Sequence, residues 1–363
     1  MEQFRLNFDS SSHCDVVIGA GILDRIEEFW KPACRDAVII GDSNTVGLFG
    51  KRIEEEIAPL VGKLRTFEFP PGEASKTRHM KEILEDRMLE EGFGRDTCII
   101  GLGGGVTLDL AGFVAATYMR GVKHINIPTS FLAQVDASIG GKTGINTDKG
   151  KNLIGAFKQP EAIIADVETL SSLSPFEWIN GVAEFVKIAF AADADFFGMI
   201  RSHGRCLMQH GQIDPQGLRR CMELKAKVVQ EDELETGRRV ILNFGHTVGH
   251  TIEQATDYRI SHGLAVSAGM ALETGIAVKM GIMDSGDRLE LIDYLKTLGL
   301  PTSPQVSFEQ AKEFFKFDKK RKSGEIRMAL PSKIGEMAGA DQGYTVVVPI
   351  DVIESVWKEW ALA

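Results

Sequence analysis

Apolar and polar residues along the first half of the chain alternate between strand-like and helix-like segments. Apolar or alternating runs predict strands over residues 37–41, 64–69, 97–102 and 125–128. Helical spacing predicts helices over residues 76–90 and 106–118. Because this alternation is typical of parallel sheets covered by helices, the first half is predicted to be an α/β nucleotide-binding domain.

From about residue 175 the pattern becomes mainly helical. Helical periodicity covers residues 175–191, 217–230, 240–256, 265–280 and 288–298. A short return to strand character spans residues 326–331. The predicted fold is therefore an α/β N-terminal domain, residues 1–172, plus an all-α C-terminal domain, residues 173–363.

Composition and charge narrow the classes of partner. The chain carries 41 Lys and Arg against 51 Asp and Glu, a net charge of -10, which disfavours a nucleic-acid partner. No stretch approaches the roughly 20 apolar residues that span a bilayer, and the first residues do not resemble a signal peptide. The five cysteines are scattered and suit a reducing compartment. We therefore expect a cytoplasmic protein with no membrane partner.

A glycine-rich turn joins a predicted strand to a predicted helix. Gly103-Gly104-Gly105 would let the backbone approach a phosphate, and the helix N-terminus adds amide donors and a positive dipole end. The dinucleotide fingerprint is incomplete, because Val106 or Leu108 occupies the position of its third glycine. The turn indicates either a nucleotide site or, equally, a tight connection without a ligand.

Histidines and one glutamate suggest a metal site. His246 and His250 lie four residues apart on one face of a predicted helix, and His262 follows. Glu184 lies in another predicted helix, one turn before Lys187. A catalytic zinc ion takes three ligands from His and Asp/Glu, so Glu184 with two of the three histidines would suffice. The alternative is that these are ordinary surface or hydrogen-bonded core histidines.

Basic residues offer candidate anion sites. Most charged side chains are solvated surface, so each candidate is weak alone. Lys142 and Lys151 are flanked by glycines, and lysines on such loops suit phosphate or carboxylate binding. The other candidates are Arg120, Lys225, Arg239 and Lys319-Lys320.

Ordered motifs from about residue 42 to residue 335 resemble the 3-dehydroquinate synthase family. They are Gly103-Gly104-Gly105-Val106 with Asp109, and residues 117–121, 128–130, 134–136, 140–144, 150–157, 183–187, 243–250 and 262–263. So many motifs in this order are specific, although each alone is weak. The resemblance implies a dehydroquinate synthase-like fold whose helical domain binds metal and substrate.

The resemblance also implies two cofactor sites. NAD would be bound by Asp42, Asn44, Glu73, Lys76, Gly104, Gly105, Val106, Asp109, Thr129, Ser130, Lys142 and Ser172, with Asp136 and Lys151 near its nicotinamide end. Zinc or cobalt would be ligated by Glu184, His246 and His262.

A substrate site is implied in the same way. Arg120, Lys142, Asn152, Asn243 and Lys319 or Lys320 would contact the substrate phosphate, with Arg120 supplied by a neighbouring subunit of a homodimer. Lys225 and Arg239 would bind the substrate carboxylate, and Lys187 the ring hydroxyls. His250 would lie near the phosphate and handle protons, rather than bind the metal.

The implied activity is that of a carbon–oxygen lyase in the shikimate route to chorismate and the aromatic amino acids. It would convert 3-deoxy-D-arabino-heptulosonate 7-phosphate to 3-dehydroquinate and phosphate by transient NAD oxidation, phosphate elimination, re-reduction and aldol closure. Leu264 and Leu234 depart from the family pattern, which usually has a carboxylate and an arginine there, and Ser130 and Ser172 replace threonines. Leu264 bears on the surroundings of the metal.

Three alternatives stay open. Another sugar phosphate cyclase, of the 2-deoxy-scyllo-inosose or valiolone type, would share the cofactors, but Arg239 with Asn243 favours a carboxylated substrate. A metal-dependent alcohol or glycerol dehydrogenase would turn NAD over stoichiometrically. A non-catalytic NAD-binding relative is disfavoured, because the metal-site residues are retained.

Overall fold

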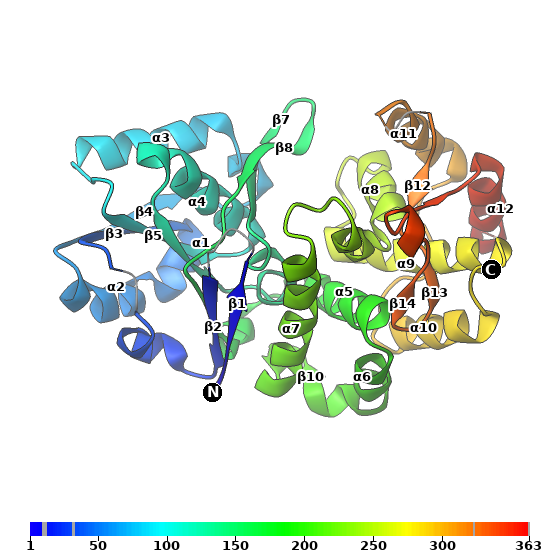
Figure 1. Cartoon of the computed structure of the whole chain (residues 1–363), viewed down its shortest axis with the longest axis horizontal. Coiled ribbons are helices and arrows are strands. Elements are labelled where there is room, and N and C mark those ends of the chain that lie inside the picture. Colours follow the sequence, from blue (N-terminus) through cyan, green and yellow to red (C-terminus); the bar gives the residue numbers. More distant parts are fainter. Residues whose placement is uncertain (9–12, 31–32, 322–323, 362–363) are drawn as a thin grey trace. The chain divides into compact units, whose positions relative to one another are not determined.

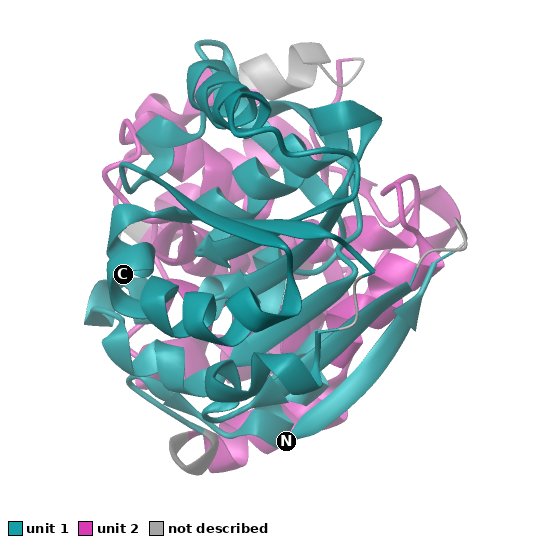
Figure 2. Cartoon of the chain, turned by 90° about the vertical axis from the view of Figure 1, so that its left-hand side faces the viewer, with its two compact units in different colours: residues 1–178, 208–222 teal, residues 179–207, 223–363 magenta. Residues whose placement is uncertain are grey.

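The computed structural model describes residues 1–8, 13–30, 33–321 and 324–361, without the side chains of residues 205–207, 316–321 and 361. Two compact units are distinguished by colour in Figure 2. Unit 1 comprises residues 1–178 and 208–222, and unit 2 comprises residues 179–207 and 223–363. The two domains predicted from the sequence, with their boundary after residue 172, stay a prediction about folding domains.

Unit 1 is built on a sheet that has the strand order β1-β2-β9-β6-β5-β3-β4 in the described residues (Figure 1). Its strands are β1 (Glu2–Asn7), β2 (His13–Gly19), β3 (Asp36–Asp42), β4 (Lys63–Phe69), β5 (Thr97–Gly103), β6 (Lys123–Pro128) and β9 (Ala162–Asp166). Neighbouring strands are parallel, except that β1 pairs antiparallel with β2. The predicted α/β domain is confirmed, and the four predicted strands correspond to β3, β4, β5 and β6.

Helices pack on both faces of this sheet, which is why its central strands are almost wholly apolar. Side chains alternate between the faces, so that Ile39 packs in one core with α2, while Val38 and Ile40 pack in the other with α3 and α4. The helices of this part are α1 (Ser43–Thr45), α2 (Lys51–Ile57), α3 (Arg78–Glu90) and α4 (Gly105–Thr117).

A separate antiparallel hairpin joins β7 (Lys142–Thr147) to β8 (Gly150–Phe157). Lys142 and Lys151 were expected on loops, and the structure corrects this by placing them on strands. Glycines hide the strand pattern because the two backbones approach closely here. A Cβ on Gly155 would lie only 2.0 Å from the carbonyl oxygen of Thr143.

Helices form most of unit 2, as expected. They are the later parts of α5 (Pro175–Ala192) and α7 (Pro215–Glu231), together with α6 (Ala194–Leu207), α8 (His246–Ala255), α9 (His262–Lys279), α10 (Ser285–Thr297), α11 (Phe308–Arg321) and α12 (Ile350–Ala361). Among the described helices, none is long and apolar enough to cross a membrane.

Short strands make the prediction of an all-α second half too simple. β12 (Arg327–Met328) pairs with β15 (Val346–Val347), and β13 (Pro331–Lys333) pairs with β14 (Glu336–Met337). In the region before α7, β10 (Met208–Gln209) pairs with β11 (Gln212–Ile213). The strand-like segment 326–331 therefore belongs to these small pairs.

The single helix predicted over residues 240–256 is two elements. A 3-10 turn, Arg238–Asn243, precedes α8, and Gly245 between them has a left-handed backbone with φ of 79°. Glycine adopts this conformation without the strain that a Cβ would add. The break makes His246 the first residue of α8.

Helices α8 and α9 cross at backbone contact distance. A Cβ added to Gly269 of α9 would lie 2.0 Å from the carbonyl oxygen of Gly245 and 2.9 Å from the amide nitrogen of Gly249. Only glycine fits at such a crossing. The close approach fixes the start of α8, with His246, against the helix that begins at His262.

We predict that Gly269→Ala destabilises the protein by about 1–3 kcal/mol, because the added methyl must push the two helices apart. Chemical denaturation measures the loss. Gly198→Ala in α6 is the matched control, since its Cβ would meet nothing within 4 Å. There the same substitution should stabilise the helix by roughly 0.5–1 kcal/mol. Equal effects of the two substitutions would contradict the packing argument.

Candidate metal centre and cofactor-binding residues

Three helices of unit 2 bring the predicted metal ligands together. Glu184 comes from α5, His246 from the start of α8 and His262 from the start of α9. Oε1 of Glu184 lies 3.6 Å from Nε2 of His246 and 3.5 Å from Nε2 of His262. One ligand atom from each residue lies within 4.8 Å of the other two, a spacing that one ion can bridge.

The Glu184 carboxylate fits a bound cation. It is fully buried, and neither oxygen accepts a hydrogen bond of normal geometry from the residues that the structure describes. Lys187, one turn later, forms an ion pair with Oε2. Buried polar atoms normally have partners, so Oε1, which faces two imidazoles without a hydrogen bond from the described residues, points to a metal ion. Two His and one Glu suit zinc or cobalt and leave a coordination position for substrate.

Hydrogen bonds orient both imidazoles for metal binding. Nδ1 of His246 lies 3.2 Å from the carbonyl oxygen of Phe244, and Nδ1 of His262 lies 3.3 Å from Oε2 of Glu253. In a neutral ring, an Nδ1 that donates its proton to such an acceptor leaves the lone pair on Nε2, the atom nearest Glu184. Both rings can therefore offer Nε2 to a metal ion beside Glu184.

The two predicted ligand histidines have pKa values shifted in opposite directions. Burial, reinforced by the Lys187 ammonium, lowers the pKa of His246 well below its ordinary value despite Glu184. Burial also lowers the pKa of His262, but the Glu184 and Glu253 carboxylates outweigh it and raise that pKa to about 10. Burial opposes ionisation of Glu184, yet Lys187 and the two imidazoles hold its pKa well below the ordinary value. A metal ion would displace the proton from His262.

His250 lies to one side of this cluster. Its side chain is 56% exposed, and its Nε2 is 4.0 Å from Oε2 of Glu253. His250, Glu253 and His262 also have ligand atoms close together, although only His262 belongs to the set around Glu184. The sequence left open which two histidines pair with Glu184, and the geometry favours His246 and His262.

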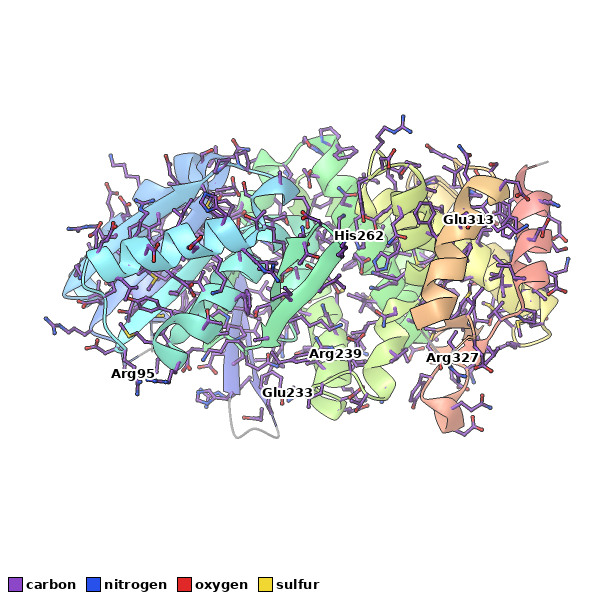
Figure 3. The ribbon with its side chains drawn as sticks, turned by 90° about the horizontal axis from the view of Figure 1, so that it is seen from above. Arg95, Glu233, Arg239, His262, Glu313 and Arg327 are labelled. Atoms are coloured by element: carbon purple, nitrogen blue, oxygen red, sulfur yellow. The ribbon has the colours of Figure 1, made fainter. Side chains whose placement is uncertain are left out.

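Buried cations form the predicted substrate-binding part of unit 2. Lys187, Lys225 and Arg239 are 1%, 6% and 2% exposed. Arg239 follows the loop 232–237, and its guanidinium donates a hydrogen bond to the carbonyl oxygen of Glu233. Figure 3 labels both residues. Lys187 forms an ion pair with Glu184, so one of these buried charges is balanced within the candidate metal site.

The loop before Arg239 is held by Asp232. Its carboxylate accepts hydrogen bonds from the backbone N–H groups of Thr236, Gly237 and Arg239. Burial raises the pKa of Asp232, but these donors outweigh it and lower the pKa overall. Asn243, at the end of the following turn, donates to Oε1 of Glu235 at 2.8 Å.

Sequence reasoning missed two buried acids, Glu253 and Glu273. Oε2 of Glu273 accepts from the Gly245 N–H at 2.6 Å, and Oε1 accepts from the Val248 N–H at 3.0 Å. No residue at the start of α8 caps it with a side chain. The Glu273 carboxylate of α9 caps it instead, and its negative charge interacts favourably with the positive end of the α8 dipole. A signal existed, because Glu273 is a lone acid within an apolar helical run. Glu253, three residues after His250, was equally visible.

The predicted NAD residues gather at the carboxyl ends of β3, β5 and β6, which are neighbours in the sheet. Asp42 ends β3, and its carboxylate accepts from the N–H groups of Asn44 and Thr45. Gly104 follows β5 and caps α4 without a side chain, so amides of its first turn, including those of Gly105 and Val106, remain for a ligand. Thr129 and Ser130 follow β6, and the Thr129 N–H donates to the Gly103 carbonyl.

Lys76 joins two other predicted site residues. Its buried ammonium lies 2.5 Å from both Oδ2 of Asp109 and Oδ1 of Asn152. Burial raises the pKa of Asp109 even though Lys76 opposes the shift. Glu73 accepts from the amide of Asn146 at 2.7 Å. The structure therefore brings Asn152, predicted at the phosphate, to the predicted cofactor residues.

A few other predicted positions remain, of which Asp136 lies near enough to Asp109 to help raise the pKa of that carboxyl. Asp136 lies in the turn Ala133–Ala137, and the Ser172 hydroxyl donates to the Thr169 carbonyl. Arg120 ends a short turn in a left-handed conformation, with φ of 67°. The side chains of Lys319 and Lys320 lie outside the described residues.

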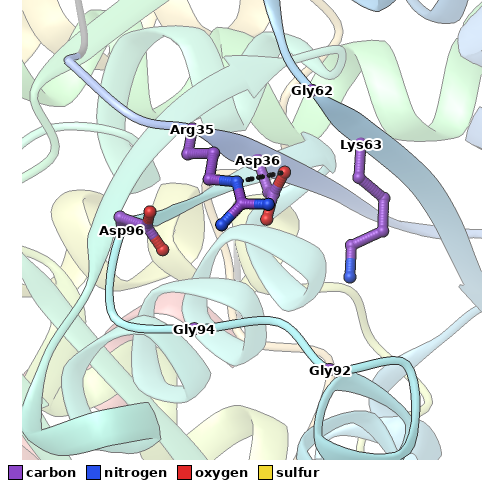
Figure 4. A pocket seen from close by; sticks show the side chains of 7 residues that line it. All are labelled: Arg35, Asp36, Gly62, Lys63, Gly92, Gly94 and Asp96. Atoms are coloured by element: carbon purple, nitrogen blue, oxygen red, sulfur yellow. Dashed lines mark ion pairs between the residues drawn. The ribbon is translucent and has the colours of Figure 1, made fainter.

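A hollow of about 270 Å³, shown from close by in Figure 4, is lined by none of these predicted residues. Its lining residues are Arg35, Asp36, Gly62, Lys63, Gly92, Gly94 and Asp96. Asp36 and Lys63 begin β3 and β4, so the hollow lies at the amino ends of the strands. Ligands of parallel sheets bind at the carboxyl ends, so this hollow does not compete as the nucleotide site.

Comparison with known proteins identifies the family. The family model described as 3-dehydroquinate synthase N-terminal matches residues 66–180, and the one described as 3-dehydroquinate synthase C-terminal matches residues 181–321. The 3-dehydroquinate synthase of Enterococcus faecalis (strain ATCC 700802 / V583) is 39% identical over 330 residues, 89% of this chain and 91% of the relative.

Solved structures of sugar phosphate cyclases are similar over nearly the whole chain. A 2-deoxy-scyllo-inosose synthase complexed with carbaglucose-6-phosphate, NAD+ and Co2+ has a TM-score of 0.90 and 27% identity, covering 99% of this chain and 100% of the other. The 2-epi-5-epi-valiolone synthase of Streptomyces hygroscopicus subsp. jinggangensis 5008, with NAD+ and Zn2+ bound, has a TM-score of 0.85 and 25% identity, covering 96% and 97%. Sequence and fold agree on one conclusion: the chain belongs to the 3-dehydroquinate synthase family.

Proposed function

We propose that this chain is a 3-dehydroquinate synthase, a carbon–oxygen lyase that converts 3-deoxy-D-arabino-heptulosonate 7-phosphate to 3-dehydroquinate and phosphate. The convergence of Glu184, His246 and His262 carries the proposal, because such a set can bind the metal that this chemistry needs. Family membership and 39% identity to a curated 3-dehydroquinate synthase support the same activity. A cytoplasmic location and a homodimer stay predictions.

Two cofactors follow from the site and the relatives. Glu184, His246 and His262 would bind Zn2+ or Co2+, and the carboxyl ends of β3, β5 and β6 would bind NAD, as expected for a nucleotide at a parallel sheet. When bound, the metal acidifies a substrate alcohol and NAD takes up and later returns its hydride, which makes phosphate loss and ring closure possible.

Protein groups would orient the substrate and neutralise its charge. Arg239 and Lys225 are buried cations suited to a carboxylate, and the planar guanidinium of Arg239 can bind it with two parallel hydrogen bonds. Lys187, paired with Glu184, would contact ring hydroxyls next to the metal. Holding these groups fixed lowers the entropic cost of reaching the transition state.

The phosphate end of the substrate would be bound by Lys142, Asn152, Asn243, Arg120 and Lys319 or Lys320. His250 is exposed beside the metal ligands, where an imidazole can exchange protons with a leaving phosphate or with solvent. Lys76 lies between Asp109 and Asn152, so we propose that it couples the cofactor residues to a phosphate contact.

The activity is tested by incubating the protein with the heptulosonate phosphate, NAD and zinc. We expect phosphate release and the cyclic product by NMR, with no net accumulation of NADH. Stoichiometric NADH would instead indicate a dehydrogenase. A phosphorylated sugar without a carboxylate is the control, and its preferential cyclisation would indicate another sugar phosphate cyclase.

We predict that His246→Ala loses the metal and the activity together. Loss of a residue that only hydrogen-bonds to a metal ligand weakens metal binding by up to roughly 100-fold. Loss of the ligand His246 itself should weaken zinc binding by more than this. Elemental analysis and phosphate release measure the two losses. His250→Ala should retain the metal, since His250 is outside the Glu184 set. Full activity of a metal-free His246→Ala protein would contradict the ligand assignment.

We predict that Arg239→Ala raises the substrate KM by about 10- to 100-fold, since a charge-assisted hydrogen bond contributes roughly 1.5–3 kcal/mol. NAD affinity should stay unchanged, as measured by direct titration. Arg239→Lys should recover part of the loss, because it keeps the charge without the fork. A matching loss of NAD binding would move Arg239 to the cofactor site.

A further inference from the structure

We propose that Glu253 is a positioning residue that fixes the imidazole of His262 and thereby sets the metal affinity of the centre. The inference rests on the proposed metal site and deepens it. Glu253 lies on α8, three residues after His250, and its side chain is almost completely buried.

Opposite edges of the His262 ring face two different carboxylates. Nδ1 is 3.3 Å from Oε2 of Glu253, and Nε2 is 3.5 Å from Oε1 of Glu184. Once a metal ion has displaced the Nε2 proton, an imidazole that donates from Nδ1 offers its Nε2 lone pair to the metal, and a carboxylate acceptor makes that lone pair more basic. Glu253 therefore selects the tautomer and the rotation that a metal at Glu184 requires.

His262 depends on this contact more than His246 depends on its own partner. His246 is 14% exposed and is oriented by a backbone carbonyl, which side-chain substitution does not remove. His262 is 31% exposed, so less packing restrains its ring. Rotation about the ring torsion is otherwise broad and roughly two-fold.

A competing role for Glu253 is direct metal binding with His250 and His262, whose ligand atoms also lie close together. That site would need Nδ1 of His262 deprotonated while Nε2 faces Glu184. An imidazole that uses both nitrogens for metals must lose a second proton, which is costly beside two carboxylates. The orienting role requires no such step, so it is the one we propose.

Metal affinity in the full chain tests the proposal. Co2+ is titrated in competition with a chelator, and the visible absorption spectrum of the bound ion reports its ligand geometry. Glu253→Leu should weaken Co2+ binding by about 10- to 100-fold and alter the spectrum. Glu253→Gln should stay within a few-fold of the unmodified protein, because its amide oxygen still accepts from Nδ1. Gln254→Leu, at the adjacent exposed position, is the matched control and should change nothing.

Each outcome decides between the roles. If Glu253→Leu binds Co2+ as tightly as the unmodified protein with the same spectrum, the inference is wrong. It is also overturned if the protein binds two Co2+ ions and Glu253→Gln binds one. If the unmodified protein binds no metal, the proposed function itself fails.

If Glu253 had a purely structural role, Glu253→Leu and Glu253→Gln would both lower the thermal stability of the metal-free protein. The spectrum of Co2+ bound to either variant would then be unchanged, and this result also overturns the proposal. Should Glu253→Leu not fold, Glu253→Asp serves instead. It keeps the charge but withdraws the oxygens by one methylene, so weaker Co2+ binding supports the proposal and equal binding overturns it.

Discussion

Burial of the Glu184 carboxylate is the constraint on which the rest of unit 2 depends. A carboxylate removed from water must be neutralised, and here one lysine and two imidazoles supply that environment. Helices α8 and α9 must therefore begin at fixed points around one side chain of α5. The glycine contacts between α8 and α9 make this possible, because only backbones in contact hold His246 and His262 near Glu184.

Two further buried acids support this centre by different means. Glu273 accepts from backbone amides at the start of α8, and so fixes the helix that carries His246. Glu253 accepts from the ring of His262 directly. Both acids are held by specific donors, as buried polar groups must be. The centre is thus surrounded by carboxylates whose charge a bound cation would help to balance.

Much of unit 1 could be predicted because its signals are local. Apolar runs marked β3, β4, β5 and β6, and helical periodicity marked α3 and α4, since parallel strands buried on both faces are apolar throughout. The hairpin of β7 and β8 was missed, because glycines at its close crossing erase alternation. The break at Gly245 was missed because periodicity does not register one left-handed residue.

The sequence by itself determined the fold class, the family resemblance and the residue types of the metal centre, because these depend on local patterning and ordered motifs. Spacing alone made His250 an equal candidate and the family resemblance implied His246 and His262, but only the tertiary structure showed that this pair faces Glu184. It also placed Glu253 beside His262, Glu273 at the start of α8, and Lys76 between Asp109 and Asn152. Most of these residues are far apart in the chain, and the position of His246 also depends on the break at Gly245. Only tertiary packing therefore brings them together.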